Sequence, residues 1–301
     1  NSFRIPSWNV VEYLVNASEL LKDGKNNHYA EKFLSVMRAA TFYAQKAKFS
    51  NYRTWWQFSK ILLNIPLELI KKEDIEMVGY WLEDRFSIAG IVMNELETWL
   101  LMLLNDKSET SRRFALILFS KVIAVEKFEK SKISFELRFK LRSHSIKDFL
   151  EKTSCKIGEV MSLEAVELMQ NALEDALKFD KSDGYSYVWR PAIENHVQNL
   201  VHEEPKKLLL VALRDSLSGL LKHDKASFEV CLGKMFLQKF QIIKRLAIYL
   251  CSEHFDSLSS GLRLKPVKKT FFTFQFKHEL WHYLNKNFRK FTDAQKKKVL
   301  A

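Results

Sequence analysis

The pentapeptide HELWH, His278 to His282, has the residue types and spacing of a zinc-binding helix. Two histidines four residues apart lie on one helix face, and the glutamate between them, Glu279, can serve as general base toward a zinc-bound water. A catalytic zinc of this kind also needs a third protein ligand. The residues after His282 contain no His and no Glu, and Asp293 is their single Asp. The nearby sequence therefore offers no convincing third ligand.

The helical period gives a second argument about this segment. With an advance of about 100° per residue, Phe276 and Leu280 share the face that should pack, and His278 and His282 fall on the opposite face. Around the helix axis, Arg289 points in a direction between those of the two histidines, about two turns further along the helix. A cation there disfavours a metal dication. We therefore predict two surface histidines, no bound metal and no cofactor, although a ligand from a distant part of the chain stays open.

Arg190 and His196 form a second pair of reactive types, in the stretch RPAIENH. An Arg followed four to six residues later by a His resembles the pattern of helical HEPN ribonucleases, in which the two side chains handle proton transfer and phosphate charge. Pro191 departs from that pattern, which usually has a polar residue after the Arg. The structural alternative is an ion pair of Arg190 with Glu194 on one helix face. We favour it, so no catalytic residue is predicted and the chain is predicted not to be an enzyme.

The composition indicates which elements must position these groups. The chain of 301 residues is 47% hydrophobic with 23 Phe and 7 Trp, yet it has only 8 Gly and 5 Pro. Sheets need turns, and turns need Gly and Pro, so the shortage favours helices. Helical periodicity runs through about a dozen segments, and 268–276 is the one candidate strand. We predict an all-α fold, an α-solenoid of HEAT/TPR-like helix pairs.

The pattern changes along the chain in three steps. Residues 1–126 are predicted to be N-terminal helical repeats, and 127–184 a less regular segment with one long helix that begins at Ser162. Residues 185–301 are predicted to be basic helical repeats, with helices behind Pro191 and Pro205. The whole is interpreted as one continuous array. The sequence does not begin with Met, which is typical of a fragment of a larger protein.

Cysteine usage and hydropathy bear on the compartment. Cys155, Cys231 and Cys251 are odd in number and have no C-x-x-C spacing, so we predict core positions and no disulfide framework. No apolar run is long enough to cross a membrane, and the start has no signal-peptide layout. These features predict a cytoplasmic protein without a membrane partner.

The charge is concentrated at the C-terminal end. The chain has a net charge of +12, of which +11 comes from residues 234–301, with 15 Lys and Arg against 4 acids. Such a basic end is typical either of a solvated surface or of contact with an anionic partner. Cations alternate with phenylalanines in RLKPVKKTFFTFQFK, which could bind nucleic acid by charge and stacking. The candidate partner-binding residues are Trp189, Arg190, Lys268, Lys269, Arg289 and Lys290.

Three stretches in the C-terminal part also occur in a familiar order. YVWRPAIENHVQN is followed by LGKMFLQKFQIIKRLAIYL and then by FKHELWHYLNKNFRKFTDAQKKKVL. This order resembles the helical repeat region of bacterial STAND-type NTPases, the Avs-like antiviral defence sensors, and the resemblance covers mainly residues 185–301. It implies that His278 and Glu279 belong to a repeat helix, and that an NTPase module lies elsewhere in a longer protein that can oligomerise. It also implies a concave surface that recognises a viral protein.

We therefore predict a protein-recognition or scaffold module. A nucleic-acid-binding helical module that uses the basic C-terminal segment is the alternative. A HEPN-like ribonuclease or a zinc hydrolase would fit the motifs less well.

Overall fold

The computed structural model describes residues 8–22, 24, 26–48, 51–82, 89–106, 108–129, 135–141, 145–179, 193–194 and 204–300. The all-α prediction is confirmed, because these residues form thirteen α-helices and short 3-10 turns, with one two-stranded sheet. Two compact units divide the chain. The first contains residues 1–126 and 138–153, and the second contains 127–137 and 154–301.

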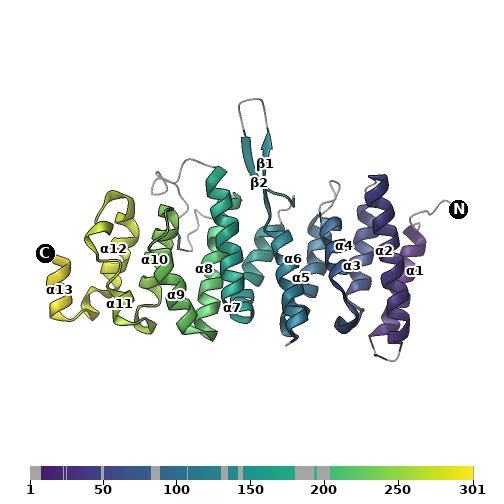
Figure 1. Ribbon diagram of the computed structural model, residues 1–301, viewed down its shortest axis with the longest axis horizontal. Helices are drawn as coiled ribbons and strands as arrows, with labels where there is room; N and C mark the ends of the chain where they lie inside the picture. The colour runs from purple at the N-terminus through teal and green to yellow at the C-terminus, as the bar shows by residue number, and fades with distance from the viewer. Residues whose placement is uncertain are drawn as a thin grey trace. The chain divides into compact units, whose positions relative to one another are not determined.

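The first unit is made of helices in two rows (Figure 1). They are α1 (Trp8–Ser18), α2 (Ala30–Ala47), α3 (Tyr52–Leu62), α4 (Lys72–Leu82), α5 (Ala89–Asn105) and α6 (Glu109–Val122). The odd-numbered helices contact one another in chain order, the even-numbered helices do the same, and successive helices join the two rows. Each helix therefore buries one face against the other row and its sides against row neighbours, as amphipathic helices require.

Aromatic stacking joins the two rows, and polar contacts join α2 to α4 within the even-numbered row. Trp55 and Trp81 are fully buried and stack with 6.0 Å between ring centroids, and the Trp81 indole N–H donates to Thr41 Oγ1 at 2.9 Å. Arg38 on α2 forms two hydrogen bonds, of 2.7 and 2.8 Å, with the buried carboxylate of Asp74 on α4. Such bidentate pairing compensates the charge of the buried carboxylate.

The strand prediction for residues 268–276 is wrong. This segment forms the 3-10 turns Lys269–Phe271 and Phe274–Phe276. It buries Phe271 and Phe276, which are five residues apart and would lie on opposite faces of a strand. The observed strands are β1 (Val125–Glu129) and β2 (Phe135–Phe139), which pair in one sheet. Strand β2 alternates apolar and charged residues in FELRF, whereas β1, VEKFE, does not, and most residues of both strands are exposed or half-buried.

Helix α7 (Ser145–Phe179) is interrupted where the sequence predicts a helix start. Ser162 has φ 54° and ψ −130°, so helical segments lie on both sides of this one residue. A hydroxyl-bearing residue is common at such a start, and Glu164 in the following turn suits the positive end of a helix dipole. The predicted start at Ser162 is confirmed.

The second unit continues after Ser162 with six more helices. They are α8 (Pro205–His223), α9 (Lys225–Met235), α10 (Gln241–Glu253), α11 (Ser260–Arg263), α12 (Lys277–Asn287) and α13 (Asp293–Leu300). Pro205 occupies the first turn of α8, as predicted. A helix is also predicted behind Pro191. The structure describes two residues of that stretch, Ile193 and Glu194, and they form a bend. Helix α10 is central, because it contacts α8, α9 and α12.

Helices α7 and α8 approach each other closely within this unit. A Cβ atom on Gly158 would overlap the carbonyl group of Ser216, at 2.6 Å from its carbon, and one on Gly219 would lie 2.9 Å from the backbone nitrogen of Glu159. Each glycine thus faces the backbone of the other helix. Ser216 strengthens the crossing by donating its hydroxyl to the carbonyl of Ser154 at 2.9 Å.

All three cysteines are free thiols, as predicted. Cys231 and Cys251 are buried in the core of the second unit, and Cys155 is half-buried. Burial raises the pKa of Cys231 to about 11 and also raises the pKa of Cys251, so both stay protonated at neutral pH. Within the described parts of the chain, no helix combines the length and apolar content that a bilayer crossing requires.

His254 should make the stability of the second unit depend on pH. Its ring packs edge-on against Phe228, and burial lowers its pKa below the ordinary value of 6.5. Between the folded and unfolded pKa values the unfolded chain binds more protons, so the free energy of unfolding rises with pH. We expect this contribution to be complete above pH 6.5 and to be lost as the pH falls below it.

Urea titrations between pH 5 and 8 test this expectation. His254→Gln should flatten the slope near pH 6, and His223→Ala, which removes an exposed imidazole, should retain it. An unchanged slope in His254→Gln would contradict the assignment.

Candidate functional site

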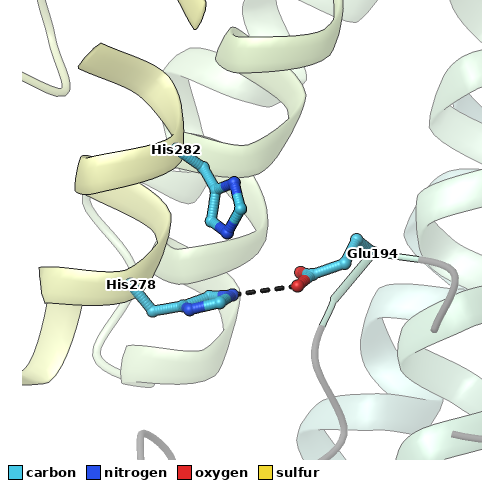
Figure 2. Close-up of side chains that lie close together, drawn as sticks. All are labelled: Glu194, His278 and His282. Atoms are coloured by element: carbon cyan, nitrogen blue, oxygen red, sulfur yellow. Dashed lines mark hydrogen bonds and ion pairs between the residues drawn. The ribbon is translucent and has the colours of Figure 1, made fainter. Parts of the chain in front are cut away.

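The histidines of HELWH face a carboxylate from a distant part of the chain. Figure 2 shows His278 and His282 on α12 and Glu194 opposite them, with a hydrogen-bonding contact of 2.9 Å between His278 Nε2 and Glu194 Oε1. The two imidazole rings lie 4.6 Å apart between centroids. One donor atom from each of the three residues lies within 4.8 Å of the others. Two imidazoles and a carboxylate therefore converge on one point.

The packing of α12 explains why the histidines point outward. Leu280 and Tyr283 are buried, and the Tyr283 hydroxyl donates to the carbonyl of Arg263. Because His278 and His282 lie on the opposite side of the helix, they are exposed, as the helical period predicts. The sequence did not point to Glu194 as their neighbour, since it lies 84 residues before His278.

Glu279 points to a different environment from the histidines that flank it. It is 3% exposed, and its Oε1 accepts hydrogen bonds from Nε and Nη2 of Arg245 on α10, at 2.9 and 2.5 Å. Its other oxygen, Oε2, is buried without a hydrogen-bond partner among the described residues. The glutamate that a zinc peptidase would use as a base is thus half of a core ion pair.

These groups line an open pocket with a volume of about 530 Å³. Its walls are Glu194, Tyr249, Ser252, Glu253, His278, Glu279, His282, Asn285 and Lys286. The ammonium of Lys286 lies 2.8 Å from Glu253, so the one cation of the wall is already paired. Glu279 is likewise paired with Arg245, so the negative charge that faces the two imidazoles comes from Glu194.

The charge of Glu194 follows from its surroundings. Burial by itself works to raise the pKa of this carboxyl group, but hydrogen bonds from its own backbone N–H and from His278 outweigh that effect. The two nearby imidazoles act in the same direction as those hydrogen bonds, and the pKa is lowered. Glu194 is therefore a carboxylate at neutral pH.

The candidate partner-binding residues differ in how they are engaged. Trp189 and Arg190 lie outside the described residues, and so does His196, so the HEPN-like spacing has no structural description. Lys268, Lys269 and Arg289 are exposed. Lys290 forms an ion pair with Asp256 at 2.5 Å and lies 5.5 Å from the ring centroid of Phe255, so its charge is partly satisfied within the unit.

The segment 268–281 exposes aromatic side chains beside lysines, and we call it the aromatic–lysine segment. Phe272 is 46% exposed, Phe274 69% and Trp281 58%. Phe271 and Phe276 anchor the segment in the core, because their rings contact each other at 5.3 Å. Cations and exposed rings occur together here, as the sequence suggested, but only part of the phenylalanine set is exposed.

In comparisons with protein-family models, with curated proteins and with solved structures, no match to this chain is found.

Proposed function

We propose that the protein is a protein-recognition module, which binds an acidic partner through the aromatic–lysine segment of its second unit. The exposure of Phe274 and Trp281 carries the proposal. Large rings on an otherwise polar surface are typical of binding sites, and Trp is among the residues that contribute most to interfaces. The two rows of helices in the first unit support the wider prediction of a helical-repeat scaffold.

The charge of this region favours an acidic partner. Residues 234–301 carry a net charge of +11, and Lys268 and Lys269 are exposed next to the rings. Cations at the rim of an interface mainly raise the association rate, while desolvated aromatic anchors determine the affinity. We therefore assign the anchoring role to the rings and the steering role to the lysines.

Variants of the rings test this division of roles. Phe274→Ala with Trp281→Ala should weaken partner binding about 30-fold, which corresponds to about 2 kcal/mol for loss of an anchor. Phe42→Ala is the matched control, because Phe42 is 67% exposed on the first unit and should leave binding unchanged. Binding partners would be those that the wild type and Phe42→Ala retain from a lysate, identified by mass spectrometry and measured again in purified form. Equal retention by the double variant would refute the proposal.

Nucleic-acid binding is the second candidate, and the lysines beside exposed rings are the observation that favours it. Its signature would be a steep loss of affinity for a single-stranded oligonucleotide between about 50 and 200 mM salt. Lys268→Glu with Lys269→Glu would then abolish binding. In the protein-binding proposal this charge variant changes the association rate, and most of the affinity remains in moderate salt.

The resemblance of residues 185–301 supports a proposal about the biological setting. We infer that the module is the sensor of a larger, cytoplasmic antiviral NTPase of the STAND type, that it recognises a viral protein, and that it oligomerises in that context. A phosphate-binding loop encoded in the same reading frame would support this inference. In a phage-challenge assay, the variant with Ala at 274 and 281 should lose protection. Full protection by that variant would count against a sensor role for the segment.

A further inference from the structure

We propose that Glu194, His278 and His282 bind one Zn²⁺ ion. The sequence argued against a metal, because no third ligand follows His282. The fold supplies that ligand from the bend at Ile193–Glu194, and it leaves both imidazoles on the exposed side of α12. Two His and one Glu form a ligand set that zinc sites with an open fourth position use.

The distances suit a small rearrangement on binding. Zinc bonds of about 2.0–2.1 Å in tetrahedral geometry place donor atoms about 3.3 Å apart. His278 Nε2 and Glu194 Oε1 are 2.9 Å apart, and the full set lies within 4.8 Å. The side chains of His278 and Glu194 are 50% and 30% exposed, so rotation of the rings meets little packing resistance. Binding would exchange one hydrogen bond for three metal bonds.

The donor types and the local charge select the metal. Imidazole nitrogen favours zinc and its transition-metal neighbours over Mg²⁺ and Ca²⁺, which prefer oxygen ligands. Cys231 and Cys251 are buried in the core and do not line the pocket, so no thiolate among them directs the site toward softer metals. Glu194 brings one negative charge to the dication, and the charges of Glu253 and Glu279 are already balanced by Lys286 and Arg245.

The buried ion pair indicates what the zinc would do. Arg245 holds Oε1 of Glu279, so this glutamate is committed to the core and is poorly placed to move protons. We therefore assign the zinc a binding and cross-linking role, in which it fastens residue 194 to α12.

A competition titration with a chromogenic chelator tests the site directly. The purified chain should take up one Zn²⁺ with a dissociation constant in the micromolar range or below. His278→Ala, His282→Ala and Glu194→Gln should each weaken binding by at least about tenfold. His223→Ala and Glu164→Gln are the matched controls, because they remove an exposed imidazole and an exposed carboxylate elsewhere in the second unit, and they should bind as the wild type does.

Two further measurements keep the result interpretable. Co²⁺ in place of Zn²⁺ should give visible absorption bands of a tetrahedral site in the wild type and not in Glu194→Gln. Zinc should also raise the melting temperature of the wild type more than that of this variant. Circular dichroism checks the folding of each variant, and His278→Asn or His282→Asn would replace an alanine variant that unfolds.

The role of Glu194 decides the outcome. If Glu194→Gln binds zinc as tightly as the wild type, the histidine pair alone holds the ion adventitiously and the proposed site is refuted. Binding that survives His282→Ala, or that falls equally in His223→Ala, would refute it as well.

Discussion

Glu279→Ala should destabilise the second unit by about 3–5 kcal/mol, because it leaves the guanidinium of Arg245 buried without its carboxylate. Arg245 and Glu279 are each 3% exposed, and both hydrogen bonds between them end on Oε1. Water therefore cannot replace the lost partner cheaply. Urea unfolding followed by circular dichroism measures the change.

Two further variants separate the effect of the unpaired Arg245 charge from a general loss of stability on substitution in this region. The double variant Arg245→Met with Glu279→Leu should recover most of the loss, because it removes both charges and retains apolar volume. Glu253→Gln breaks the exposed pair with Lys286, and it should cost at most about 1 kcal/mol. If Glu279→Ala lowered the free energy of unfolding by no more than Glu253→Gln does, that result would contradict a buried ion pair.

Gly158→Ala should cost about 3 kcal/mol, and Gly219→Ala a similar amount, although alanine is the better helix former by about 1 kcal/mol. The added methyl group would overlap backbone atoms of the facing helix, which cannot rotate away as a side chain can. Helices α7 and α8 would have to separate, with loss of packing along the whole crossing.

Gly261→Ala is the matched control for this pair. It lies in a helix with no atom within 4 Å of the new methyl group, so it should be neutral or slightly stabilising. The melting temperatures of the three glycine variants, measured by thermal unfolding, rank their stabilities. Stabilisation in Gly158→Ala would show that helix propensity outweighs contact there and that the helices do not touch at this point.

Local signals in the sequence predicted much of the helical structure. Pro205 and Ser162 mark helix starts by backbone preference and capping chemistry, which act within a few residues. The outward direction of His278 and His282 follows from the helical period alone. The strand pair was not predicted, because both strands are short and only β2 (FELRF) alternates apolar and charged residues, while β1 (VEKFE) does not.

The candidate site could be predicted only in part. The motif HELWH shows two imidazoles, but it does not show their neighbours. Glu194 contacts His278 from 84 residues away, and Arg245 pairs with Glu279 from 34 residues away. Such pairings depend on the path of the whole chain, and the segment itself carries no trace of them. The burial of Glu279 is equally a tertiary effect, since a glutamate is placed in a core only when a cation meets it there.

The partnership of Glu279 with Arg245 has an evolutionary consequence. With zinc at the proposed site, Arg245 would keep Glu279 away from the metal, because a neutral residue at 245 would release a carboxylate beside two imidazoles in a pocket that also contains Glu194. One substitution at 245 would then leave Glu279 available beside the metal ligands, provided that the lost stability were restored elsewhere. The distance to the side-chain arrangement of a zinc hydrolase is thus short in mutational terms.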